Sequence, residues 1–101
     1  MKIIKRDGHI VDYNSEKIRT AIGKANKEVR GKEKATEEEI EKIIKYIEEL
    51  NKKRILVEDI QDIIEEKLME FEKYKLAKKY ITYRYTRELV RKANTTDQTI
   101  K

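Results

Sequence analysis

Four stretches of this chain repeat apolar residues every three or four positions, which is the spacing of one face of an α-helix. Lys and Glu fill the positions between them, as is typical of a helix that buries one face and leaves the other in water. The pattern therefore predicts a small bundle of four amphipathic helices. The four stripes are Ile18, Ala21, Ile22, Ala25 and Val29; Ile40, Ile43, Ile44, Ile47 and Leu50; Ile60, Ile63, Ile64 and Leu68; and Leu76, Ala77, Tyr80, Ile81 and Leu89.

Local signals indicate where these helices begin and end. Asn14 suits the N-cap of the first helix, and Thr36 followed by Glu39 has the pattern of a capping box for the second. Residues 51–53 (NKK) end the second helix, and the apolar phase is lost at residues 71–74, where we expect a break before the fourth.

The chain opens with two short β-rich runs on either side of Asp7-Gly8. Asp-Gly favours a two-residue hairpin turn, in which both central residues have positive φ. Such a turn would pair Ile4 with Val11, and Ile3 and Ile10 would lie on the opposite face.

Because an isolated hairpin is only marginally stable in water, this one must lie against other elements. Residues 54–57 (RILV) are too few for a helix and could add a third strand to it. The expected fold is mainly α (α+β): a four-helix bundle capped by a small three-stranded sheet.

Composition excludes several classes of function. The 101 residues suffice for one domain, and they contain no Cys and a single His. A disulfide scaffold, a thiolate zinc site and a Ser/His/Asp or Cys/His catalytic set are therefore excluded, and no Gly-rich phosphate loop is present. We expect no catalytic residue and no metal site. No apolar run approaches the ~20 residues of a membrane span, so we expect no membrane partner. The high Lys and Glu content with no Cys fits a cytoplasmic protein.

Charge is distributed unevenly along the chain. Residues 1–32 carry nine Lys/Arg against four Asp/Glu, residues 33–72 carry seven against fourteen, and residues 73–101 carry nine against two. If the two basic ends meet in space, they would form a pocket that favours an anionic ligand. The alternative is that most of these charges belong to solvated helix faces.

Several polar residues fall where the stripes predict partial burial, and they are the candidate binding residues. A basic side chain at a helix seam can simply extend to solvent along its apolar neighbours, and charges in a hairpin can serve solubility alone. Several of them together make a phosphate site the better interpretation. The candidates are Lys5 and Arg6 in the hairpin, Lys17 on the first helix, Gln61 on the third, and Arg84 and Arg87 on the fourth.

Three blocks of sequence resemble the ATP-cone family, and together they span residues 2–93. They are residues 3–8 (IIKRDG) with residues 14–18 (NSEKI), residues 57–65 (VEDIQDIIE) and residues 77–84 (AKKYITYR). The resemblance implies a four-helix bundle with a hairpin lid over ATP or dATP, which act as allosteric effectors and bring Mg²⁺ with them. It also implies an effector-dependent homo-oligomer.

The resemblance also implies roles for individual residues. Lys5, Arg6 and Lys17 would lie near the triphosphate, as would Arg87 and Arg84. Asn14 would contact the adenine, and Gln61 would approach the sugar. Val11 stands where some cones carry an acidic residue that helps to read adenine, so adenine selectivity would rest on Asn14 and on backbone groups.

Residues 91–97 (RKANTTD) resemble the junction between the cone and the catalytic body of anaerobic (class III) ribonucleoside-triphosphate reductase. Residues 1–93 would then be the regulatory domain and residues 94–101 the start of a linker to that body, its partner in the parent oxidoreductase. Two alternatives stay open: a small basic nucleic-acid-binding or transcription-regulatory domain that uses the last helix, and a helical interaction module without a small ligand. The acidic middle of the chain disfavours nucleic acid as a partner.

Overall fold

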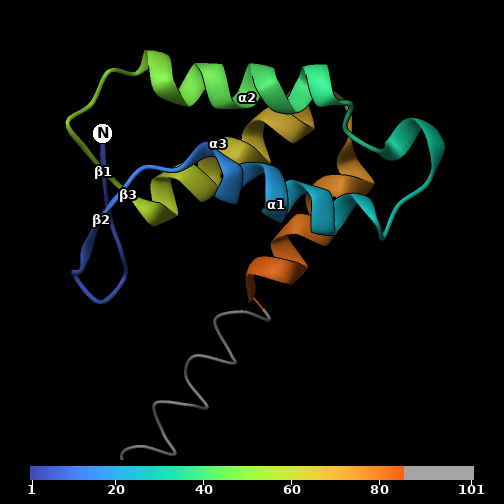
Figure 1. Ribbon diagram of the computed structural model, residues 1–101. Helices are drawn as coiled ribbons and strands as arrows, with labels where there is room; N and C mark the ends of the chain where they lie inside the picture. The colour runs from blue at the N-terminus through green and yellow to red at the C-terminus, as the bar shows by residue number, and fades with distance from the viewer. Residues whose placement is uncertain (86–101) are drawn as a thin grey trace, which may run out of the picture.

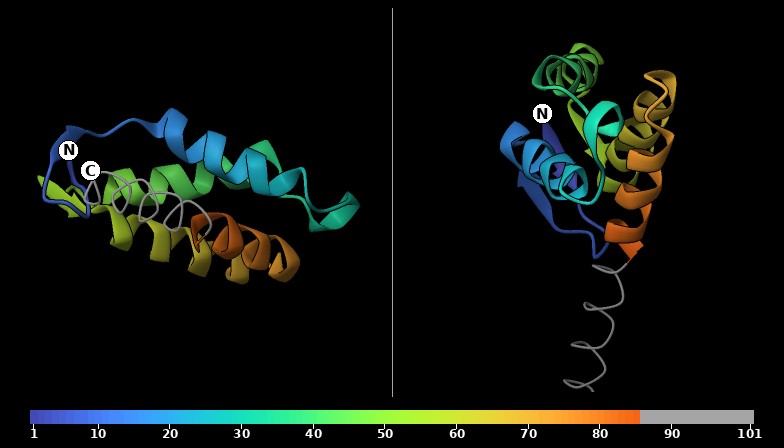
Figure 2. Two further views of the ribbon diagram at one scale, coloured as in Figure 1. Left: turned by 90° about the horizontal axis from the view of Figure 1, so that it is seen from below. Right: turned by 90° about the vertical axis from the view of Figure 1, so that its right-hand side faces the viewer.

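A computed structural model describes residues 1–85 of the chain, in which four helices and a three-stranded sheet form the predicted α+β fold (Figure 1). The elements in chain order are β1 (Lys2–Ile4), β2 (Ile10–Asp12), α1 (Ser15–Asn26), the 3-10 turn η1 (Gly31–Glu33), α2 (Glu37–Glu49), β3 (Arg54–Leu56), α3 (Val57–Glu70) and a last helical segment over residues 74–85. The sheet lies at one end of the bundle and η1 at the other (Figure 2).

The predicted helix boundaries are confirmed by the contacts that make them. The Asn14 side chain accepts a hydrogen bond from the Glu16 amide at 2.9 Å and caps α1. Thr36 and Glu39 form a reciprocal capping box, with bonds of 3.1 and 2.9 Å. After α2 the chain turns at Asn51, whose φ is 53°. Residues 71–73 are not helical and separate α3 from the last helical segment.

The third strand is also confirmed. The strand order is β2-β1-β3, with β1 antiparallel to β2 and parallel to β3. Ile3 therefore lies at the centre of the sheet, opposite Val11 on one side and Ile55 on the other. Ile3 and Ile55 are buried, so the inner face of the sheet closes this end of the core.

The predicted hairpin register is wrong by one residue. The Gly8 amide donates to the Lys5 carbonyl at 2.9 Å and the Lys5 amide donates to the His9 carbonyl at 2.7 Å, which makes a three-residue loop. Gly8 alone in this loop has positive φ, at 92°. Asp7 accepts a hydrogen bond from the His9 amide. A three-residue loop of this kind needs only one left-handed residue, which here is Gly8.

The corrected register changes which residues face the core. Ile3 now pairs with Val11, and Ile4 pairs with Ile10, whose side chain is 48% exposed. Ile3 and Val11 together face the helices, because residues directly opposite each other in two paired strands lie on the same face of the sheet.

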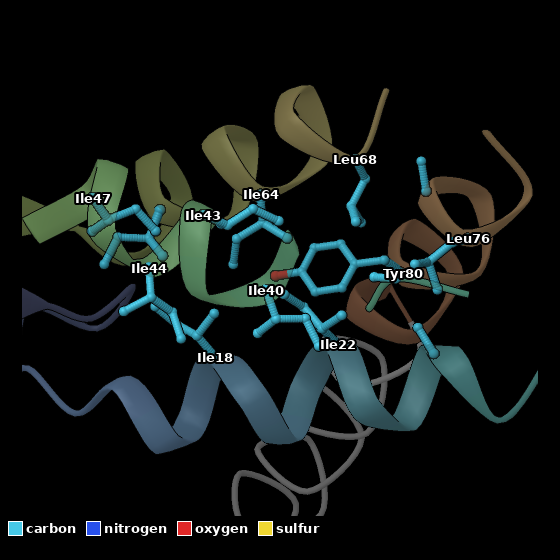
Figure 3. Close-up of a cluster of buried hydrophobic side chains, with 14 of the residues drawn as sticks. Ile18, Ile22, Ile40, Ile43, Ile44, Ile47, Ile64, Leu68, Leu76 and Tyr80 are labelled. Atoms are coloured by element: carbon cyan, nitrogen blue, oxygen red, sulfur yellow. The ribbon is translucent and has the colours of Figure 1, made fainter. Parts of the chain in front are cut away.

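The core is formed by the four predicted stripes, with Ile contributed by all three complete helices (Figure 3). Two details differ from the prediction: Ile81 is 40% exposed, and Val29 is buried but lies beyond the end of α1. Leu89 lies outside the described residues, so its place in the stripe stays a prediction. Within residues 1–85, no helix is both long and apolar enough to cross a bilayer. The side chains buried most completely are Ile22, Ile43, Ile47, Ile64, Leu68 and Leu76.

Candidate functional site

A cavity of about 160 Å³ lies where the sheet meets α1, α3 and the last helical segment. Its apolar wall comes from the core stripes and from the inner face of the hairpin. Four of the seven predicted site residues line it, although they are far apart in sequence: Lys5, Asn14, Lys17 and Gln61. Its other lining residues are Ile3, Val11, Asp12, Tyr13, Ile18, Ala21, Val57, Ile60, Ile64 and Tyr80.

Lys5 and Lys17 supply the positive charge of this cavity. Lys5 is the residue directly after β1, and Lys17 lies in the first turn of α1. Neither has an ion-pair partner among the described residues. Two ammonium groups without a carboxylate partner, beside an apolar cavity, are a suitable environment for an anion attached to an apolar or aromatic group.

The Asn14 side chain is held in a fixed orientation at the cavity wall. Its Oδ1 accepts from the Glu16 amide, which is the N-cap bond of α1. An Asn amide also carries two N–H donors on Nδ2. With Oδ1 committed to the cap, Nδ2 is the group that can donate to a ring nitrogen of a bound base.

Arg6 connects the hairpin to α3. Its Nη2 donates to Oε1 of Gln61 at 3.3 Å, and its Nε lies 3.6 Å from Oε1 of Glu58. The hairpin is thus closed onto the helix that lines the cavity. Gln61 is only partly buried and keeps its own Nε2 donors for another partner.

Arg84 does not line the cavity. Its Nη1 donates to Glu65 at 2.6 Å and to Asp62 at 3.2 Å, and only 19% of its side chain is exposed. Burial acts to lower the pKa of Arg84, but the hydrogen bonds to Glu65 and Asp62 outweigh it and leave the pKa raised. In this structure Arg84 therefore joins the last helical segment to α3. Arg87 lies outside the described residues.

A protein-family model described as the ATP cone domain matches residues 1–89. The chain belongs to the ATP-cone family. Its relatives include the alpha subunit of ribonucleoside-diphosphate reductase from Chlamydia muridarum, 37% identical over all of this chain and 11% of the relative. The same subunit from Chlamydia trachomatis is 37% identical over 90% of this chain and 10% of the relative.

A third relative of this ATP cone is the vitamin B12-dependent ribonucleoside-diphosphate reductase of Thermoplasma acidophilum, 35% identical over 89% of the chain and 12% of the relative. The cone thus spans about a tenth of the length of these reductases. All three are named as diphosphate reductases, whereas residues 91–97 resemble an anaerobic triphosphate reductase. The anaerobic class therefore stays a prediction.

Tyr80, Tyr13 and Glu58 are not among the predicted site residues, yet they lie at the cavity or at the contact that closes it. Tyr80 belongs to a predicted core stripe, and its ring lies in the core beside Ile64 and Ile22 (Figure 3), but it also lines the cavity. Burial raises the pKa of Tyr80 above its usual value. Tyr13 lines the cavity beside Asn14, and a position directly before the N-cap was the signal that could have found it. Glu58, which faces Arg6, is one turn before the predicted Gln61.

Proposed function

We propose that this ATP cone binds ATP or dATP beneath its hairpin and thereby regulates a ribonucleotide reductase. The observation that carries the proposal is the convergence of Lys5, Lys17 and the oriented Asn14 amide on one cavity. The apolar wall suits a base, Nδ2 of Asn14 suits a ring acceptor, and the two ammonium groups suit phosphate oxygens.

The size of the cavity bears on how a nucleotide would bind. Pockets for small ligands usually measure about 300–1,000 Å³, and this one measures about 160 Å³. It can take the base or the sugar but not a whole nucleotide. The phosphates would therefore lie at its mouth, along Lys5 and Lys17, or the hairpin would have to lift.

We propose that Mg²⁺ binds only together with the nucleotide. No group of three His, Cys, Asp or Glu side chains among residues 1–85 is arranged to hold a metal ion. Mg²⁺ keeps several waters and commonly binds through phosphate oxygens. The ion would thus be held by the triphosphate and by water, and Lys5, Lys17 and Arg6 would offset the remaining negative charge.

Regulation requires that ATP and dATP stabilise two conformations to different extents, because only differential affinity shifts a population. The two nucleotides differ by one 2′-hydroxyl. Gln61 is our candidate for the group that contacts it, since it lines the cavity and also holds Arg6 of the hairpin. A contact between Gln61 and the sugar would therefore alter the hydrogen bond that holds Arg6 and the hairpin against α3.

We further propose that the cone corresponds to residues 1–93 and that residues 94–101 begin the linker to a reductase body. An anaerobic ribonucleoside-triphosphate reductase is the proposed parent on the basis of residues 91–97. That enzyme would supply deoxyribonucleotides in the cytoplasm, and the effector would act through subunit assembly, with the cone as one of the assembling surfaces.

The test is calorimetric titration of ATP and dATP, with Mg²⁺, into this chain. We expect saturable binding that weakens tenfold or more in the Lys5→Ala, Arg6→Ala double variant, because hydrogen bonds to charged groups contribute roughly 1.5–3 kcal/mol each. Lys78→Ala with Lys79→Ala is the matched control, since both are exposed and neither lines the cavity. Equal affinity in the two double variants would contradict the site.

A second function is favoured by one observation. A groove of about 730 Å³ near η1 is lined by Arg30, Lys75, Lys78 and Lys79, together with Glu28 and Glu33. A nucleic-acid-binding domain would use such a surface. It predicts binding of an oligonucleotide duplex with a steep salt dependence, lost in the Lys78→Ala, Lys79→Ala variant and not competed by free nucleotide.

A further inference from the structure

The two described arginines that the sequence assigns to phosphates are both held by carboxylates of α3. Arg84 is bound by Glu65 and Asp62, and Arg6 is bound by Glu58 together with the amide oxygen of Gln61. Each guanidinium group is thus already paired with a carboxylate on α3, which is the same kind of anionic acceptor as a phosphate oxygen.

The two contacts differ in strength. The Arg84–Glu65 pair has an N–O distance of 2.6 Å and side chains that are 19% and 18% exposed. The Arg6–Glu58 pair is longer, at 3.6 Å, and Glu58 is 54% exposed. Exposed ion pairs are weak and screened by salt. The Arg84 contact is consequently suited to a permanent connection, and the Arg6 contact is suited to one that opens and closes.

We propose that Glu58 acts as an internal competitor of the nucleotide: it holds Arg6 against α3, keeps the hairpin closed, and must be displaced before Arg6 can reach a phosphate. This inference rests on the proposed nucleotide site and assigns its regulation. We call the contact of Arg6 with Glu58 and Gln61 the Arg6 latch.

Two arguments support the Arg6 latch. The cavity under the closed hairpin is about 160 Å³, which is too small for a whole nucleotide, so the closed form binds incompletely. The apparent affinity of a ligand falls in proportion to the fraction of protein in the competent form. Any residue that favours closure therefore weakens binding, and removal of the Glu58 charge should strengthen it.

The affinity test compares Glu58→Gln with Asp59→Asn by calorimetry with ATP. Both changes remove one negative charge from the first turn of α3, but Asp59 has no ion-pair partner among residues 1–85. We expect Glu58→Gln to tighten binding about two- to fivefold, the range for an exposed ion pair, and Asp59→Asn to change it little. Equal tightening in both variants, or weaker binding in Glu58→Gln, would overturn the inference.

A second measurement needs no nucleotide, so it separates failure of the latch from failure of the proposed function. The chain has no Cys, so spin labels can be placed at His9→Cys in the loop and Glu66→Cys on α3, both exposed. Without ligand, Glu58→Gln should broaden the distance distribution and lengthen its mean, and Asp59→Asn should not. An unchanged distribution in Glu58→Gln would refute the latch even if ATP binds, and a broadened one would support it even if ATP does not.

Discussion

Replacement of Gln61 by Ala tests two roles of this side chain separately: its hydrogen bond with Arg6 of the hairpin and its proposed contact with the 2′-hydroxyl of the nucleotide. Gln61 lines the cavity, and its Oε1 accepts from Arg6 at 3.3 Å. Loss of the Arg6 contact would affect ATP and dATP alike, since both carry the same phosphates. Loss of a contact to the 2′-hydroxyl would affect ATP alone. The ratio of the two dissociation constants therefore isolates the contact to the sugar.

The magnitude follows from one neutral hydrogen bond, which contributes about 0.5–1.5 kcal/mol. This corresponds to a ratio of about two- to tenfold between ATP and dATP in the unmodified chain. Gln61→Ala should bring the ratio close to one. The assay is calorimetry with both nucleotides on each protein, and Glu66→Ala, an exposed neighbour on α3, is the control that should keep the ratio.

Two results would refute this reasoning. If Gln61→Ala changes the affinity for both nucleotides by the same factor and keeps their ratio, Gln61 acts on the hairpin through Arg6 but does not contact the sugar. If the unmodified chain already binds both equally, no group in the cavity distinguishes the 2′-hydroxyl.

Three further predictions concern stability. Leu68→Ala should lower the free energy of unfolding by about 2–5 kcal/mol, because Leu68 is fully buried; a loss below about 1 kcal/mol in urea unfolding would contradict the described core. Thr36→Ala should cost about 1 kcal/mol, roughly 4–8 °C in Tm, through loss of the α2 cap, and exposed Thr20→Ala should cost less. Burial raises the pKa of Tyr80 in the folded chain above 10.0, so the folded state holds the hydroxyl proton more tightly than the unfolded state. The resulting contribution to the free energy of unfolding is fully present below pH 10.0 and is lost as the pH rises further. Tyr80→Phe should then unfold at higher pH than the unmodified chain, as followed by circular dichroism, and an unchanged midpoint would contradict the burial.

Local chemistry made much of the fold predictable. Asn14 and the Thr36–Glu39 pair satisfy backbone donors that every helix start leaves open, so their pattern marks a boundary wherever it occurs. The apolar run at residues 54–57 is too short for a helix, which favoured a strand, and residues 54–56 form β3. Lys5, Asn14, Lys17 and Gln61 line one cavity, since each lies at the end of an element or at a helix seam. Their contact with a nucleotide stays a prediction.

The error in the hairpin register arises because Asp7-Gly8 is compatible with two kinds of turn. Asp-Gly fits a two-residue turn with two positive φ values, but it also fits a three-residue loop in which Gly8 alone is left-handed and Asp7 accepts from the His9 amide. The second avoids a strained φ at Asp7. The resemblance implies that Arg84 lies near phosphates, and helical spacing alone does not show that it meets Glu65 and Asp62 on α3. Its contact with a nucleotide stays a prediction.

The central claim is that one cavity beneath the hairpin binds an adenine nucleotide. Its most direct test is titration of ATP and then dATP into the isotope-labelled chain while amide chemical shifts are recorded. We expect saturable shifts at Lys5, Asn14, Lys17 and Gln61, with little change at Glu33 near the opposite end of the bundle. Saturable shifts confined to Lys78 and Lys79, or no saturable shifts at all, would contradict it.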